Sequence, residues 1–251
     1  MDCLEVRQAV FFAINTQALI DLSGGREFYG DPGDNPVKPV LGLDYAPTTG
    51  NIHDPAWKIT GNPDKAKELL ATAKTKCPAT YDKATNPAKG ITYDLSNTAT
   101  NQKASVLLKD ALTLAGINVK FNFIPSGQYY STIGDRTKQS DISAAGWGAD
   151  WANASTVIPE LFTKEGGANY TQNWNDPAYA AFKAKSDKAL AETDRKKQAA
   201  MWKELSQYVM DQYWIIRPIF SKGQFVWNSG VGGVGYWEPQ GNFLFTSMYI
   251  K

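Results

Sequence analysis

Two tryptophans flank a single aspartate in the segment AGWGADW, residues 145–151. The indole rings of Trp147 and Trp151 are expected to shield the carboxylate of Asp150 from water, and a shielded carboxylate must be protonated or paired with a cation. Aromatic faces also attract cations. The segment therefore predicts a site for a positively charged group. A structural interpretation stays equally open, in which a tryptophan belongs to the core and Asp150 caps a helix that begins near Ser155.

Other residue patterns favour no catalytic or cofactor site. Together with Asp150, the carboxylates Asp135, Asp141, Glu160 and Glu165 raise the hypothesis of a glycosidase, which needs two facing carboxyl groups, but the polar neighbours of most of them indicate solvated side chains. The run GVGGVG, residues 230–235, matches a dinucleotide fingerprint in spacing, but the following YWEPQG cannot open a helix, so it is interpreted as a surface turn.

Metal and redox sites are not expected either, and no cofactor is predicted. Cys3 and Cys77 are the only cysteines and form no C-x-x-C pair. His53 is the only histidine, and it lies in the turn-rich segment GNIHDPAWK, which favours a solvated loop position.

The composition is that of a globular protein with an ordinary core. The chain has 251 residues, of which 43% are apolar, and its 26 basic and 25 acidic residues give a net charge of +1. This balance offers no attraction for nucleic acid or an anionic membrane. No run approaches the roughly 20 apolar residues of a spanning helix, and the first residues lack the pattern of a signal peptide.

Hydrophobic periodicity and caps predict alternating helices and strands, that is, an α/β fold. Helices are expected at residues 4–15, 62–74, 102–116, 175–192 and 195–212, and strands at 91–95, 117–124, 141–148 and 243–250. Residues 214–227 are expected to form two β-rich runs on either side of the turn at 221–223. Asn62 followed by Pro63 is a strong helix start, and Asp176 before Pro177 is another. Residues 77–90 are expected to form turns. The tryptophan segment then lies at the carboxyl end of a strand, where open α/β sheets bind ligands.

Four stretches together resemble one protein family. They are VRQAVFFAIN at 6–15, NPDKAKELL at 62–70, LLKDALTLAGINVKFNFIPSGQYY at 107–130 and AAGWGADW at 144–151. In this order and spacing they are similar to the family 5 extracellular solute-binding proteins, which serve peptide-class ABC importers, and most of all to the actinobacterial branch. The resemblance covers nearly the whole chain.

The resemblance implies the type II periplasmic-binding-protein fold, in which two lobes close on a ligand. The VRQA helix normally stands near the start of the second lobe, so residues 1–217 are expected to form lobe two and residues 218–251 to return to the sheet of lobe one. The chain would then lack most of the first lobe, the signal peptide and the lipoprotein cysteine of a longer parent protein. Localisation would be extracellular or periplasmic, with the parent tethered to a membrane.

The resemblance also assigns a ligand site. In peptide-binding members the aspartate of a W-x-x-D segment pairs with the terminal ammonium of the ligand, and Asp150 occupies that position here. Trp147, Trp151 and the backbone at Gly146 and Gly148 complete the expected ligand-binding set. Some dipeptide binders hold the ligand carboxylate with an arginine before the helix that here begins near Gln102, but SNTATNQ, residues 96–102, has no basic residue. Longer peptides, or an oligosaccharide, stay open as ligands.

Further expectations follow from the resemblance. Because the family is exported, Cys3 and Cys77 are expected to form a disulfide. The partners would be a peptide or other small solute, the permease subunits of an importer, and the first lobe of the same protein. Without that lobe, Trp147, Trp151 and the strand at 243–250 would leave an apolar surface, through which dimerisation is expected. No enzymatic activity is expected.

Overall fold

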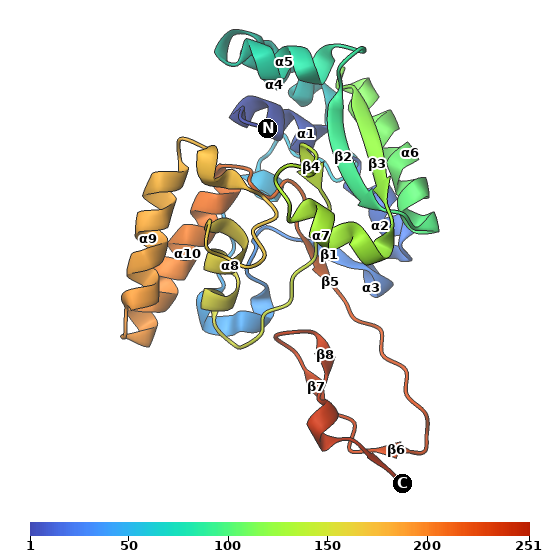
Figure 1. Cartoon of the computed structure of the whole chain (residues 1–251), viewed down its shortest axis with the longest axis vertical. Helices are drawn as coiled ribbons and strands as arrows, with labels where there is room; N and C mark the ends of the chain where they lie inside the picture. The colour runs from blue at the N-terminus through green and yellow to red at the C-terminus, as the bar shows by residue number, and fades with distance from the viewer.

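The computed structural model describes residues 1–251 and shows an α/β arrangement with an extended C-terminal segment (Figure 1). The helices are α1 Leu4–Ala13, α2 Thr16–Leu22, α3 Gly25–Phe28, α4 Pro63–Lys76, α5 Pro78–Thr85, α6 Ala99–Leu114, α7 Tyr129–Ile133, α8 Ile158–Phe162, α9 Tyr179–Ala191 and α10 Arg195–Asp211. The strands are β1 Gly30–Pro32, β2 Ile91–Ser96, β3 Val119–Ile124, β4 Ile142–Ser143, β5 Ile219–Ser221, β6 Val231–Gly232, β7 Tyr236–Trp237, β8 Asn242–Phe243 and β9 Tyr249–Ile250.

The largest sheet has three parallel strands in the order β3-β2-β4. Helix α6 connects β2 to β3, which is the crossover that parallel neighbours require. Thr98 caps α6 by accepting a hydrogen bond from the amide of Asn101, and Gly116, at a φ of +80°, follows its end. The prediction of an α/β fold is therefore confirmed.

A first hydrophobic core lies between this sheet and the helices α1, α4 and α6 (Figure 1). Helix α4 starts as expected, because the side chain of Asn62 accepts a hydrogen bond from the Lys65 amide and Pro63 occupies the first turn. The fully buried members of this first core include Val6, Ala9, Ala66, Ala73, Leu112 and Ile117. Small residues on α1 and α4 allow these two helices to pack closely.

A second hydrophobic core joins α8, α9 and α10. Asp194 caps α10, and the apolar face of that helix buries Trp202, Leu205 and Val209 completely or almost completely. In the same core Phe162 of α8 and Phe182 of α9 pack edge to face on each other, with ring centroids 6.2 Å apart. Residues 4–217 thus contain two large hydrophobic cores, besides a small third cluster of Ile124, Tyr129 and Ile133.

After α10 the chain still contributes Tyr213 to the first core and Trp214 to the second, and it leaves both cores after Ile216. Strand β5 pairs antiparallel with β1, and the backbones approach so closely that a Cβ at Gly30 would collide with the carbonyl oxygen of Phe220. The later strands form two short antiparallel pairs, β6 with β9 and β7 with β8. In Figure 1 this red segment extends away from the helices, and its aromatic rings pack mainly on one another.

Several local predictions were wrong. Residues 78–85 form helix α5 rather than turns, because Ala84 is fully buried and Tyr81 packs on the first core. The strand expected at 141–148 is reduced to Ile142–Ser143, and the residues after it continue as a loop in which Trp147 packs on the second core. The strand expected at 243–250 is interrupted by a 3-10 turn at Phe245–Ser247. Helix α2 was not predicted.

Candidate functional site

The tryptophan segment follows β4 as an irregular loop that folds back on residues 154–156. The Trp147 indole donates a hydrogen bond of 2.7 Å to the carbonyl oxygen of Thr156. The Thr156 hydroxyl donates one of 2.9 Å to the carboxylate of Asp150. The Trp151 indole donates to the Ser155 hydroxyl at 3.1 Å. Each residue of the predicted W-x-x-D pattern is thereby fixed to the same short turn.

A buried carboxylate holds that turn in place. Asp44 is completely inaccessible, and its Oδ2 accepts a hydrogen bond of 2.7 Å from the amide of Ala154. Its Oδ1 lies 2.6 Å from Nη1 of Arg195 at the start of α10. Because a buried carboxylate needs such a countercharge, this ion pair ties the turn to the second core.

The side chain of Asp150 is exposed, as is that of Trp151, which is 52% accessible. The expectation that both rings shield this carboxylate from water is therefore wrong for this chain, because Trp147 turns toward the second core while Trp151 faces solvent. The capping hypothesis is also wrong, since Asn153 is the residue whose side chain accepts from the Ser155 amide. Asp150 keeps a carboxylate oxygen available to an incoming group.

The C-terminal segment covers part of the loop. The amide of Ala149 donates a hydrogen bond of 3.2 Å to the carbonyl of Pro239. A Cβ at Gly148 would lie 2.6 Å from the carbonyl oxygen of Gln240, so only glycine permits this approach. In this structure Gly148 therefore faces residues 239–240.

A cavity of about 760 Å³ opens beside the loop, between the two hydrophobic cores. This volume lies in the range of small-molecule sites. Its walls are residues 139–147 on one side and 213–221 on another, together with residues from α1 and the loop before η1, Pro39–Asp44. Of the predicted ligand-binding residues, Gly146 and Trp147 line the cavity, while Gly148, Asp150 and Trp151 do not.

A second buried carboxylate shapes the cavity wall. Asp94 of β2 is fully buried, and it accepts hydrogen bonds from the amide and hydroxyl of Ser140 at 2.8 and 2.7 Å. The side chains of Asn122 and Ser143 also donate to it. Tyr129 donates its hydroxyl to the carbonyl of Ala144 at 2.6 Å. These contacts hold residues 140–144 against the sheet.

Charged pairs on the cavity wall were not predicted from the sequence. Arg7 of α1 and Asp176 form a buried ion pair at 3.0 Å, and Lys83 lies 2.6 Å from Asp141. Burial lowers the pKa of Arg7, against the opposing effect of Asp176. Burial by itself raises the pKa of Asp141, but hydrogen bonds from Lys83 and Thr92 outweigh it and lower the pKa overall. No local motif announces either pair, because the partners are far apart in sequence.

The only histidine also has a partner. Nε2 of His53 lies 3.0 Å from Oδ2 of Asp34, a buried carboxylate to which the Tyr45 hydroxyl also donates. Burial and the charge of Asp34 raise the pKa of Tyr45 to about 12. His53 is exposed in the turn Asn51–His53, as expected of a solvated loop histidine, but its contact with this carboxylate was not predicted.

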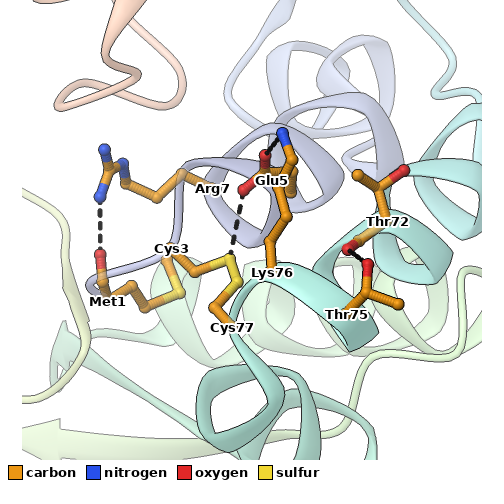
Figure 2. The surroundings of a disulfide bond; sticks show 8 residues. All are labelled: Met1, Cys3, Glu5, Arg7, Thr72, Thr75, Lys76 and Cys77. Atoms are coloured by element: carbon orange, nitrogen blue, oxygen red, sulfur yellow. Dashed lines mark hydrogen bonds and ion pairs between the residues drawn. A yellow bond between two sulfur atoms is a disulfide. The ribbon is translucent and has the colours of Figure 1, made fainter.

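The cysteines are joined as expected. Cys3, before α1, and Cys77, after α4, form a disulfide across 74 residues of sequence (Figure 2). Beside it, Lys76 lies 2.6 Å from Glu5, and this hydrogen bond lowers the pKa of Glu5. Because the sulfur atoms are bonded to each other, neither is a thiolate available to a metal.

Comparison with known families identifies the chain. Residues 1–169 match the model of the bacterial extracellular solute-binding proteins, family 5, middle region. The chain belongs to this family. Membership confirms the recognition made from the four sequence stretches, and it confirms the prediction of a binding protein rather than an enzyme.

Solved structures of proteins named as peptide-binding proteins share the fold. The clavulanic acid biosynthesis oligopeptide binding protein 2 is similar with a TM-score of 0.74 and 18% identity, over 98% of this chain and 43% of that one. An oligopeptide ABC transporter substrate-binding domain from Bacillus anthracis gives 0.68 at 17% identity, over 99% and 46%. A dipeptide binding protein from Pseudoalteromonas sp. SM9913, in complex with Met-Leu, gives 0.68 at 18% identity, over 100% and 46%.

The present chain spans under half the length of these solved proteins. It is an α/β chain that corresponds to about half of a peptide-binding protein fold. No curated protein matches it significantly. None of its helices combines the length and the apolar character needed to cross a membrane.

Proposed function

We propose that this chain is part of the solute-binding component of an ABC importer, and that it binds a peptide with Asp150 as the anchor of the terminal ammonium. Support comes from family membership and from relatives that are named as peptide-binding proteins, one of them described with the dipeptide Met-Leu. The proposal of an ammonium anchor rests on the position and exposure of Asp150. Asp150 is an exposed carboxylate, three residues after a tryptophan that lines the cavity.

The local chemistry is suited to an ammonium. The Thr156 hydroxyl satisfies Oδ2 of Asp150 and orients the carboxylate, and no cation is paired with it. An incoming ammonium would form a charge-assisted hydrogen bond there, and the face of Trp151 would add cation-π attraction. Strand β4 lies at the edge of its sheet, and residues 144–147 continue from it. An extended peptide could form backbone hydrogen bonds with this free edge.

The proposal includes the placement of the chain in a larger protein. Residues 1–217 would form the second lobe, and residues 218–251 would return to the sheet of the first lobe, which fits the extended course of the C-terminal segment (Figure 1). The full protein would act on the extracellular or periplasmic side and deliver its ligand to permease subunits. Exposed apolar residues of the tail, such as Val226, Phe245 and Ile250, would contact the first lobe, or a second copy of the chain in its absence.

Calorimetry on peptides with free and acetylated amino termini tests the anchor. The variant Asp150→Asn keeps the size and removes the charge, so affinity for the free-amine peptide should fall about tenfold or more, with the melting temperature preserved. Asp110→Asn, an exposed carboxylate on α6, is the matched control and should bind like the wild type. Equal affinity of the wild type for acetylated and free peptides would exclude Asp150 as an ammonium anchor.

A further inference from the structure

The β7–β8 hairpin turns back from the C-terminal segment toward the helices (Figure 1). Its two strands are joined by residues 238–241, which form the tip of the hairpin. Gly241, at a φ of +74°, closes the tip by donating its amide to the carbonyl oxygens of Trp237 and Glu238. Hydrogen bonds within the hairpin therefore define the shape of the tip.

The tip makes the only hydrogen bond between residues 223–251 and the rest of the chain. The amide of Ala149 donates to the carbonyl oxygen of Pro239 at 3.2 Å, and the other hydrogen bonds of this segment lie within it. The carbonyl oxygen of Gln240 approaches Gly148 so closely that a Cβ there would lie 2.6 Å away. The hairpin thus meets the rest of the chain at residues 148 and 149.

Pro239 lies at the edge of a small apolar pocket beside this contact. Four other apolar side chains that line the pocket belong to the second core or pack on it, namely Leu41, Trp147, Ala149 and Val157. Pro239 is half-buried, while the residues on either side of it in the tip are exposed. Burial of the proline ring therefore adds an apolar contact to the hydrogen bond.

The loop beneath the tip is held in place by other contacts. Trp147 donates to the Thr156 carbonyl, and the Thr156 hydroxyl donates to Asp150. The aromatic rings of the hairpin pack on one another, and none of them belongs to either core. Departure of the tip would therefore break one hydrogen bond and expose one proline ring, while both cores stay intact.

We propose that the tip acts as a strap, which closes over the loop at residues 147–150 and must leave before a peptide binds there. The inference rests on the proposed function, because it regulates the site of the Asp150 anchor. The strap occupies the amide of Ala149, directly before Asp150, and lies against Gly148. A peptide and the strap therefore compete for the same stretch of backbone. A site that is covered part of the time has an apparent affinity reduced in proportion to its open fraction.

Hydrogen exchange at the Ala149 amide reports the strap without a ligand. Pro239→Ser removes the ring from its pocket, and Gly241→Val places a β-branched side chain at a positive φ. Each of these strap variants should speed the exchange of this amide about threefold or more, with an unchanged melting temperature, because the strap opens more often. Val226→Ser, at a residue of the same segment that is 92% exposed, is the matched control and should not change it. Unchanged exchange in both strap variants overturns the proposal.

Calorimetry with trialanine amide tests the competition, because this probe carries an ammonium and no carboxylate. Both strap variants should bind the probe about three to ten times more tightly than the wild type. Val226→Ser should bind it like the wild type. Faster exchange without a gain in affinity overturns the strap, since the tip would then cover no contact that the ligand uses.

Asp150→Asn separates this proposal from the ammonium anchor. Weaker binding of trialanine amide by Asp150→Asn, with no gain in the strap variants, retains the anchor and overturns the strap. A gain in the strap variants, with no loss in Asp150→Asn, retains the strap and overturns the anchor. No binding by any of these proteins overturns both.

Discussion

The guanidinium of Arg7 lies 3.0 Å from the carboxylate of Asp176, and this pair joins the helix at the centre of the first core to the segment that leads into α9. Arg7 also donates to the carbonyl oxygens of Met1 and Gln212, and Asp176 accepts from the Trp214 indole at 3.2 Å. One charged network therefore connects the two cores beside the cavity. Disruption of this network should lower the stability of the whole fold.

Asp176→Ala is expected to destabilise the fold by about 3 to 5 kcal/mol, because it leaves the buried guanidinium of Arg7 without a countercharge. Urea denaturation measures the loss. The double variant Arg7→Met, Asp176→Leu should be closer to the wild type, since it removes both charges together. Equal stability of Asp176→Ala and wild type would mean that the pair does not join the cores.

The disulfide should contribute about 4 kcal/mol, because it closes a loop of 74 residues in the unfolded chain. The variant Cys3→Ser, Cys77→Ser should show this loss in thermal or urea unfolding under oxidising conditions. Adding a reductant should destabilise the wild type and leave the double variant unchanged. A reductant effect on both proteins would point to a different cause.

The wall at residues 140–144 depends on the negative charge of Asp94. Asp94→Asn replaces one acceptor oxygen with a donor group, which would face the donating Ser140 amide in the place of Oδ2, or the donating Ser140 hydroxyl and Asn122 side chain in the place of Oδ1. We expect a loss of about 2 to 4 kcal/mol, through unsatisfied buried donors. Hydrogen exchange should show faster opening at Ser140 and Ala144 than in the wild type. Thr98→Ser, in the cap of α6, is a control with little expected effect.

Much of the helical framework could be predicted from the sequence, because caps are local signals. Asn62 and Thr98 lie beside the amides that they cap, and α10 follows directly on Asp194. The cavity could not be predicted in this way. Arg7 and Asp176 are 169 residues apart, and Arg217 and Lys38 meet the same space from different segments. Asp150 was predicted from its motif as a site residue, and this stays a prediction; its exposure could not be predicted, because it depends on where residues 154–156 fold back.

The decrease in the free energy of unfolding at acidic pH should depend on Asp141. Its pKa is lowered in the folded state, so its contribution is fully present above the unfolded pKa of about 4 and is lost as the pH falls through the folded value. Asp141→Asn should therefore lower stability at neutral pH and flatten the decline below about pH 4. Denaturation curves across this range check the sign. An unchanged acid limb would contradict it.

Thr156 offers a way to separate the charge of Asp150 from its orientation. Thr156→Val removes the hydroxyl that donates to Oδ2 of Asp150 and accepts from its amide, while the main-chain carbonyl that holds Trp147 stays. Stability should fall by about 1 kcal/mol. Peptide affinity should fall far less than in Asp150→Asn, because the carboxylate keeps its charge. Thr156→Ser retains the hydroxyl and should behave as the wild type. If Thr156→Val loses as much affinity as Asp150→Asn, the orientation of the carboxylate, and not its charge alone, governs binding.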